Sequence, residues 1–420
     1  MSRRTSAIRL VGPLALVGAA LLPACGGDDD AGGRTQLEFF QFKGEAIDTF
    51  KAIVADFEAE YPNIDIVQND SPNADAAIRT RLVRGDVPDL MTLNGSGNFA
   101  QLARADVFYD FSDEPVLDTV NPAIVKILTD LGTGGAGDEV NGIPFANNAD
   151  GVIYNKDLFA DYGVEVPTTW DEMIAAADTF QEAGIPPFYI TLKDAWTSLP
   201  LWNALASNLP PEDFWSQVDD GETTFVEDHA LVAERLRQLF DYGQEDKFSK
   251  GYEDGNRAFA EGNVPMLLQG IWAIGQVQDL NPEFEIGTFA LPTDDPEETK
   301  LVSGVDVALT MPRNPEHPEE SLTFIEYLMR PEVIEKYLSE QAAIPTLTGM
   351  LSEDPALTGL LPYFEEERLV GFSDHQIPAS IPLQQINQSY LIDGDQQKYL
   401  ETLDNEWDKF VKRRPEREDR

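Results

Sequence analysis

The chain has 420 residues, 42% of them hydrophobic, and its 75 acidic against 30 basic side chains give a formal net charge of −45 at pH 7. So acidic a surface repels phosphate backbones, which excludes nucleic acid as an expected partner. The length and the apolar content suffice for two or three domain-sized units with their own hydrophobic cores.

The first 24 residues predict a signal peptide for export. They contain arginines but no acid, and their apolar run, 10–22, is too short to cross a bilayer as a finished helix. Cys25 follows directly and opens a flexible tether rich in Gly and Asp, 25–33. This placement resembles the lipoprotein box of bacteria, in which the cysteine becomes the acylated first residue. A plain secretory signal followed by a free cysteine is the alternative, and the choice between Sec and twin-arginine export stays open.

Cys25 is the only cysteine in the sequence. We therefore expect an exported body without disulfides, held together by its own core. No later segment is long and apolar enough to cross a membrane, so a lipid on Cys25 is the only anchor expected.

After the tether, short apolar runs alternate with segments of helical periodicity, which is typical of parallel βαβ units and of the α/β fold class. Each predicted strand is short and strongly apolar, as burial on both faces requires. The predicted strands are 37–42, 64–68 and 89–93, and the predicted helices between and after them are 47–60, 74–84 and 99–104.

A second block begins at Val140. Gly-Ile-Pro-Phe at 142–145 leads into Gly-Val-Ile-Tyr-Asn-Lys-Asp-Leu-Phe at 151–159, and Val-Pro-Thr-Thr-Trp-Asp-Glu follows at 166–172. Thr169 and Glu172 have the spacing of a capping box, which predicts the start of a helix running to Ala183.

This block resembles the family 1 extracellular solute-binding proteins, the substrate receptors of bacterial ABC importers for sugars. The resemblance rests on Gly-x-Pro-Phe, the Tyr-Asn-Lys-Asp-Leu-Phe run and the Pro-x-Thr-Trp-Asp-Glu helix start. It extends over nearly the whole mature chain, as far as about Pro345. Further matches in the family's order are Phe57-Glu58 with 61–64, 84–89, 259–262 with Met266, 270–272, and Leu291-Pro292.

The resemblance implies a periplasmic-binding-protein-like (venus-flytrap) fold, with two α/β lobes that close over a ligand and three segments that cross between them. The crossings are expected near 144–148, 264–267 and 328–330. The N-terminal lobe would combine residues 34–145 with 266–329, and the C-terminal lobe 146–265 with 330–420. Ligands belong at the carboxyl ends of the strands, where the loops of both lobes converge.

Sugars present an apolar C–H face to aromatic rings and a rim of hydroxyls to planar polar groups. Trp272 matches the family's Gly-x-Trp, whose indole forms a stacking platform. Trp196 follows a predicted strand end at Ile190, and Asp194 stands beside it. We expect these three side chains to contact the ligand, with core packing as the alternative for each indole.

Loops after the predicted strands and the crossings supply the other candidate ligand contacts. Polar residues at strand ends more often form turns or cap helices than bind ligands, and each candidate carries this alternative. These candidates are Gln41, Lys43, Asn94, Ser96, Asn147, Asn148, Asp150 and Asp306.

Other chemistries have weaker support in the sequence. Residues 95–100 formally satisfy the dinucleotide pattern G-x-G-x-x-G/A, but a tight turn into a helix explains them more simply. His229, His317 and His375 are too dispersed in sequence for a metal site, and no Gly-x-Ser-x-Gly nucleophile elbow occurs. We therefore expect no metal and no cofactor.

The resulting hypothesis is a monomeric, lipid-anchored receptor outside the cytoplasm, with no enzymatic activity. It captures a neutral mono- or oligosaccharide and delivers it to a membrane permease. Two alternatives stay open. One is a secreted glycoside hydrolase, which paired carboxylates would serve equally well. The other is a surface sugar receptor for signalling.

Overall fold

The computed structural model describes residues 34–413, apart from 72, 73, 135, 136, 282, 284, 342 and 379. The predicted signal peptide, Cys25 and the tether lie outside the described residues. The fold belongs to the compact unit that begins at Thr35. No helix of the described part combines the length and the apolar character needed to cross a bilayer.

The first part of this unit is a parallel sheet with helices, as the sequence predicts. Its strands are β1 (Thr35–Gln41), β2 (Ile64–Asp70) and β3 (Leu90–Leu93), with β1 in the middle. Its helices are α1 (Ile47–Glu60), α2 (Ala74–Arg84), α3 (Gly97–Ala103) and α4 (Pro122–Thr133). The predicted bounds of the first two helices are confirmed residue for residue.

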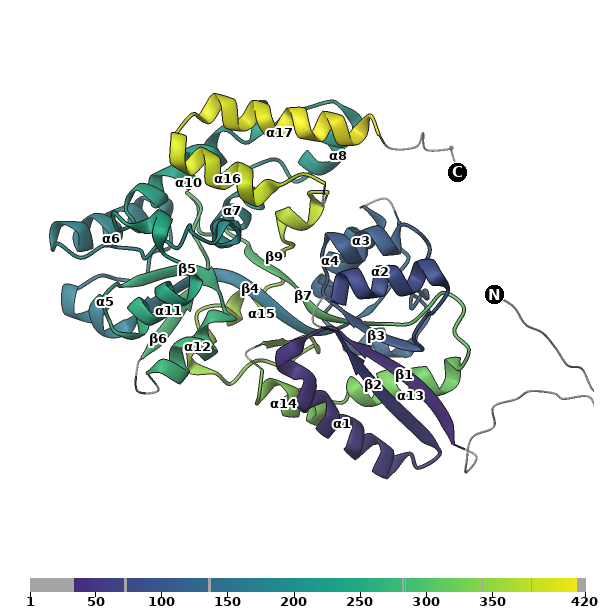
Figure 1. Cartoon of the computed structure of the whole chain (residues 1–420). Helices are drawn as coiled ribbons and strands as arrows, with labels where there is room; N and C mark the ends of the chain where they lie inside the picture. The colour runs from purple at the N-terminus through teal and green to yellow at the C-terminus, as the bar shows by residue number, and fades with distance from the viewer. Residues whose placement is uncertain are drawn as a thin grey trace, which may run out of the picture. The chain divides into compact units, whose positions relative to one another are not determined.

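Two long strands connect this sheet to the rest of the fold (Figure 1). β4 (Ile143–Asn155) pairs antiparallel with β7 (Leu301–Thr310) from Ile143 to Ala149. From Asp150 onward β4 pairs instead with β5 (Met266–Gly270) and β6 (Ile286–Phe289). The polar stretch 147–150 therefore lies where β4 exchanges its partners.

The whole sheet has the order β2-β1-β3-β7-β4-β5, with β6 and β8 (Ile344–Pro345) on β4 and β9 (Leu369–Val370) on β7. Among the strand pairs of the described residues, β1–β2, β1–β3 and β7–β9 are parallel and the others are antiparallel. The expectation of parallel pairing thus holds for the first strands, whereas β4 has antiparallel partners throughout.

Helices make up most of the remaining chain. The α-helices are α5 (Lys156–Tyr162), α6 (Trp170–Glu182), α7 (Leu199–Ala206), α8 (Phe214–Asp220), α9 (Phe225–Asp228), α10 (Ala230–Asp241), α11 (Tyr252–Ala260), α12 (Ala273–Leu280), α13 (Pro318–Leu328), α14 (Pro331–Leu338), α15 (Leu361–Glu365), α16 (Leu383–Asp393) and α17 (Gln396–Val411). The 3-10 helices are η1 (Gly44–Ala46), η2 (Pro115–Thr119), η3 (Ala195–Ser198), η4 (Lys247–Ser249), η5 (Pro355–Leu357) and η6 (Ser373–Gln376).

The predicted capping box at the start of α6 is confirmed. The Thr169 hydroxyl accepts from the Glu172 amide, and the Glu172 carboxylate accepts from the Thr169 amide. The strand predicted to end at Ile190 is not formed. Phe188 makes only isolated bridges, to Gly243 and Met266, because the chain turns away after one residue.

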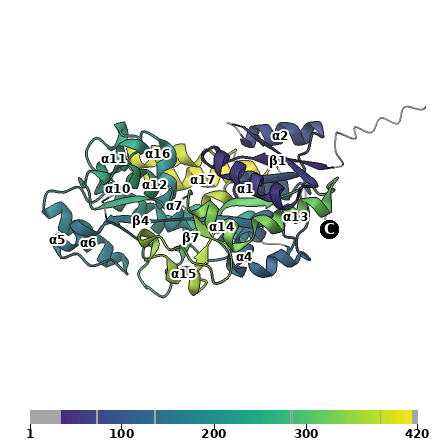
Figure 2. The same ribbon diagram turned by 90° about the horizontal axis from the view of Figure 1, so that it is seen from below.

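Three hydrophobic clusters make up the core, and one of them, with Leu93, Ile153 and Phe259, takes residues from β3, β4 and α11. A second cluster holds Phe39, Phe50 and Phe324, on the side of β1 to β3. The third holds Trp202 and Trp407, from α7 and α17. The α/β class and the two-lobed arrangement are confirmed, while the boundaries of the lobes stay a prediction. Figures 1 and 2 show α14 beside α1, and the two helices share the second of these clusters.

Candidate functional site

A cleft of about 130 Å³ lies where β4 exchanges its partners. Its lining comes from β4, η3, α7, β7, η6 and the residues just after β3, just before η6 and just before α12, so it joins segments that are far apart in sequence. The lining residues are Asn94, Asn148, Asp150, Trp196, Leu199, Pro200, Asn203, Trp272, Val305, Phe372, Asp374 and His375.

Two indoles, from Trp272 and Trp196, line the cleft, and both are half-buried. The Trp272 ring lies over Gly270, where an added Cβ would stand 2.0 Å from Cζ3 of the indole. The Trp196 ring packs against Tyr252 at a centroid distance of 4.9 Å. A half-buried ring held by its neighbours offers a fixed apolar surface to a ligand.

Asp150 is the most deeply buried acid of the cleft. It is 2% exposed, and neither of its carboxyl oxygens has a hydrogen-bond partner of good geometry, although the Asn203 side chain lies close by. Burial raises the pKa of Asp150 well above its usual range, the nearby Asp374 carboxylate raises it further, and the Asn203 side chain offsets part of the rise. A buried carboxylate needs hydrogen-bond donors, and few surround Asp150, so its protonated form is favoured.

Asp374 stands beside Asp150 but comes from η6, which the buried Asn203 of α7 holds in place. The Asp374 amide donates to the Asn203 side-chain oxygen at 2.9 Å. Oδ1 of Asp374 is buried without a partner, and Nε2 of His375 lies 3.9 Å away from it. The side-chain oxygen of Asn148 is also buried without a partner. Several acceptors therefore face the cleft without donors from the protein.

The N-terminal wall of the cleft includes Asn94, whose amide donates to the Asp306 carbonyl oxygen at 3.1 Å. The Asp306 carboxylate forms an ion pair with Lys43, and both side chains are nearly buried. Neither residue of this pair lines the cleft, and their two charges neutralise each other.

The structure brings together Asn94, Asn148, Asp150, Trp196 and Trp272 among the predicted contacts, and it places the others elsewhere. Gln41 is fully buried and bonds to the backbone of Lys43. Asn147 is buried and donates to the Ser303 hydroxyl at 2.5 Å. Asp194 accepts from the Tyr252 amide at the start of α11. Ser96 precedes α3, and Ser96, Lys43 and Asp306 do not line the cleft.

Seven other residues line the cleft without having been predicted as contacts, namely Leu199, Pro200, Asn203, Val305, Phe372, Asp374 and His375. The η6 residues follow no predicted strand end, and they lie in the part of the chain where the family resemblance is loose. One sequence feature relates to Phe372, namely the glycine at position 304 in β7. Its missing side chain leaves room for the Phe372 ring, since an added Cβ would stand 2.2 Å from Cδ2 of Phe372.

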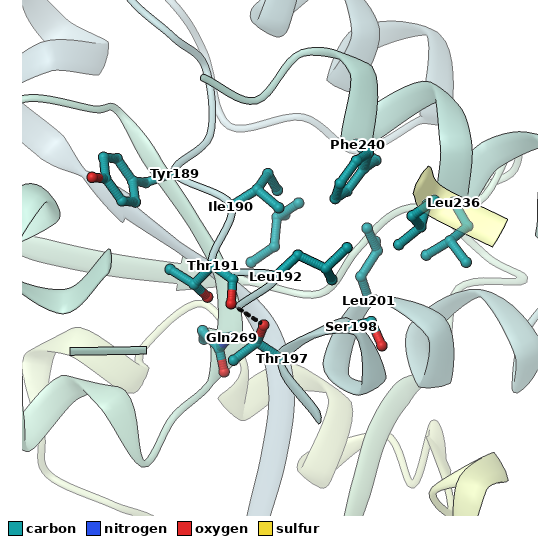
Figure 3. A pocket seen from close by; sticks show the side chains of 12 residues that line it. Tyr189, Ile190, Thr191, Leu192, Thr197, Ser198, Leu201, Leu236, Phe240 and Gln269 are labelled. Atoms are coloured by element: carbon teal, nitrogen blue, oxygen red, sulfur yellow. Dashed lines mark hydrogen bonds between the residues drawn. The ribbon is translucent and has the colours of Figure 1, made fainter. Parts of the chain in front are cut away.

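Two other cavities are less suited to a sugar. Figure 3 shows an internal cavity of about 20 Å³ in which the Thr197 hydroxyl donates to the Thr191 carbonyl oxygen and Oε1 of Gln269 has no partner. That volume holds about one water molecule. A wider hollow of about 390 Å³ is formed by 162–168 and one face of α6, and no indole lines it.

Close packing accounts for the glycine-containing turn at 95–100. The Gly95 amide donates to the Val305 carbonyl oxygen, and an added Cβ would stand 2.8 Å from that oxygen, so close packing explains the glycine. Within the described residues, His, Cys, Asp and Glu side chains form no group of three or more that could hold a metal ion.

Comparison with known proteins finds solute-binding and sugar-binding proteins as relatives. Residues 43–335 match the family described as bacterial extracellular solute-binding protein. The multiple sugar-binding protein of Streptococcus mutans is 28% identical over 357 residues, 81% of this chain and 83% of the relative. The melibiose/raffinose/stachyose-binding protein MelE of Bacillus subtilis is 22% identical over 346 residues, 78% of this chain and 77% of the relative. The solved structure of RafE in complex with raffinose is 28% identical, with a TM-score of 0.75 over 90% of this chain and 100% of that one.

Proposed function

Because the chain belongs to the bacterial extracellular solute-binding protein family, we propose that it is the substrate receptor of an ABC importer for a neutral mono- or oligosaccharide. It works outside the cytoplasm, anchored to the membrane through a lipid on Cys25. It takes the sugar between its two lobes and delivers it unaltered to a permease. The names of its relatives support a carbohydrate, and raffinose is the first ligand to test.

The observation that carries this proposal is the composition of the cleft. Trp196 and Trp272 supply aromatic faces, and the buried oxygens of Asn148 and Asp150 lack donors. A sugar satisfies both at once, because its C–H face covers a ring while its hydroxyls donate to the oxygens. Contacts to both lobes at the same time would favour a closed state.

The direct test is calorimetric titration with raffinose, stachyose, melibiose, galactose and maltotriose. Trp272→Ala should weaken binding by about 1 to 3 kcal/mol if the indole stacks on the sugar. Trp215→Ala is the matched control, because Trp215 packs against Trp407 away from the cleft. It should lower stability and leave affinity unchanged. Equal affinities for wild type and Trp272→Ala would reject the indole as a contact.

One observation favours the hydrolase alternative, namely the pair of carboxyls, Asp150 and Asp374, in the cleft. A glycosidase also uses a protonated acid beside a second carboxylate. Incubation with the same sugars, followed by chromatography, separates the two functions. Unchanged sugar supports the receptor, and shorter products support the hydrolase.

The anchor needs its own experiment, since Cys25 lies outside the described residues. In cells of the native host, Cys25→Ser should move the protein from the membrane fraction to the medium. A variant that stays with the membrane would show that something other than the lipid holds it there.

A further inference from the structure

We propose that Asp374, together with Asp150, forms an acceptor floor in the cleft that binds adjacent hydroxyls of one sugar unit and releases a proton to solvent as it does so. This inference rests on the proposed function and makes it more specific. It assigns a recognition role to Asp374 and Asn203, and it predicts that sugar capture depends on pH.

The geometry of the floor supports hydroxyl donors as ligands. Both oxygens of Asp150 and Oδ1 of Asp374 are buried without a hydrogen-bond partner. Asn203 holds the backbone of Asp374 in place and lies next to Asp150, so it fixes one acid relative to the other. Buried acceptors without donors are costly, and adjacent hydroxyls supply the missing donors.

The charges around the floor leave the acids uncompensated. Among the described residues that line the cleft, no lysine or arginine occurs, and His375 faces Asp374 from the same short helix. The neighbouring α7 and β5 carry no charged residue. On β7, Asp306 is paired with Lys43. Near η3, Asp194 already accepts from the Tyr252 amide.

The proton balance follows from these surroundings. In the free protein Asp150 retains its proton more readily than an ordinary carboxyl, because burial and the neighbouring Asp374 carboxylate disfavour its ionised form. When sugar hydroxyls donate to the Asp150 oxygens, they stabilise its ionised form. The carboxyl proton then passes to the buffer, while every O–H and C–O bond of the sugar stays intact. Affinity therefore rises with pH through the range in which Asp150 titrates.

The experiment is titration calorimetry of the full chain with raffinose in buffers of different ionisation enthalpy. Stachyose, melibiose, galactose or maltotriose replaces raffinose if one of them is the sugar that binds. The slope of the observed enthalpy against the buffer enthalpy counts the protons released. We expect release by the wild type and none by Asp150→Asn. Asp374→Asn should bind roughly 10- to 100-fold more weakly, since it removes a charged acceptor.

Asp404→Asn is the matched control. Burial also raises the pKa of Asp404, but this acid accepts backbone amides at the start of α9 and does not line the cleft. Proton release and affinity should match the wild type in this variant. Thermal unfolding of each variant verifies that it is folded.

The outcomes separate this inference from the proposed function. Sugar binding without proton release, or release that persists in Asp150→Asn, overturns the acceptor floor and leaves the receptor intact. Unchanged affinity in Asp374→Asn removes that residue from recognition and also overturns the proposal. Failure to bind any carbohydrate overturns both. Binding of a protonated amine such as glucosamine in preference to the neutral sugars would show that the floor selects charge, which overturns the hydroxyl role.

Discussion

His229 is a fully buried histidine surrounded by aromatic rings, with Phe214 and Phe225 at centroid distances of 4.3 and 4.8 Å. Neither ring nitrogen has a hydrogen-bond partner. Burial lowers the pKa of His229 to about 3, since the charged imidazolium cannot be solvated there. The residue is therefore neutral at physiological pH and acts as an aromatic core side chain.

This burial predicts a pH dependence of stability. The unfolded chain binds a proton at His229 below pH 6.5, whereas the folded chain does so only below about 3. Between these values the unfolded state holds more protons than the folded state. The free energy of unfolding therefore falls by up to about 1.4 kcal/mol for each unit by which the pH is lowered. Urea unfolding of His229→Leu should show a shallower loss of stability over this window than the wild type does. Parallel pH profiles for the two proteins would contradict the assignment.

Gly270 supports the cleft by lacking a side chain. Since an added Cβ would stand 2.0 Å from Cζ3 of Trp272, Gly270→Ala must displace the indole. We expect roughly tenfold weaker binding of raffinose in calorimetry, comparable with the loss of one aromatic contact. Gly44→Ala is the control, because nothing lies within 4 Å of an added Cβ at Gly44. Wild-type affinity in Gly270→Ala would mean that the ring position does not matter.

At the scale of elements, the start of α6 shows how a short pattern determines a local structure. The Thr169 hydroxyl and the Glu172 carboxylate satisfy amides at the helix terminus in both directions. Thr169→Ala should therefore destabilise the protein by about 1 kcal/mol in denaturant unfolding. Thr169→Ser, which keeps the acceptor, should be nearly neutral. If both substitutions cost the same, the methyl group and its packing matter more than the cap.

The elements also show what the sequence could and could not predict. The bounds of α1 and α2 were readable because their apolar positions repeat with the helical period. The strand at Ile190 was not formed, since an apolar run of a few residues fits a bridge as well as a strand. The η6 helix has no periodic signal in its four residues, and its place in the cleft depends on Asn203, which is distant in sequence.

The candidate site was predictable in part for the same reason. Asn148 and Asp150 lie within the one strand that both halves of the sheet share, and the family resemblance pointed to that segment. Gln41 and Asp194 also follow apolar runs, yet their side chains bond to backbone, Gln41 to nearby Lys43 and Asp194 to the Tyr252 amide at the start of α11. Sequence alone cannot tell a strand-end acceptor that faces a cleft from one that caps a turn.

At the scale of the whole molecule, β4 connects the two parts of the sheet. Its first half pairs with β7 and its second half with β5 and β6, and the cleft residues Asn148 and Asp150 lie at the change. Under the proposed function, a ligand in the cleft would therefore contact the strand that joins the two parts of the sheet. A movement of the lobes on binding requires differential contacts in the open and closed states.

The net charge of −45 acts on the molecule as a whole and predicts a response to salt. Acids exceed bases by far, so mutual repulsion opposes the compact state at low ionic strength. Salt screens this repulsion over about 10 Å at 0.1 M and also weakens exposed ion pairs such as Lys126 with Asp130, which contribute little. Repulsion therefore dominates, and Tm should rise by roughly 2 to 5 °C between low salt and 0.5 M NaCl, a shift equivalent to about 1 kcal/mol or more.

Sucrose of equal osmolarity is the control, because it stabilises by exclusion from the surface without screening charge. A Tm that falls with NaCl, or that rises no more than it does in sucrose, would mean that local ion pairs outweigh the repulsion.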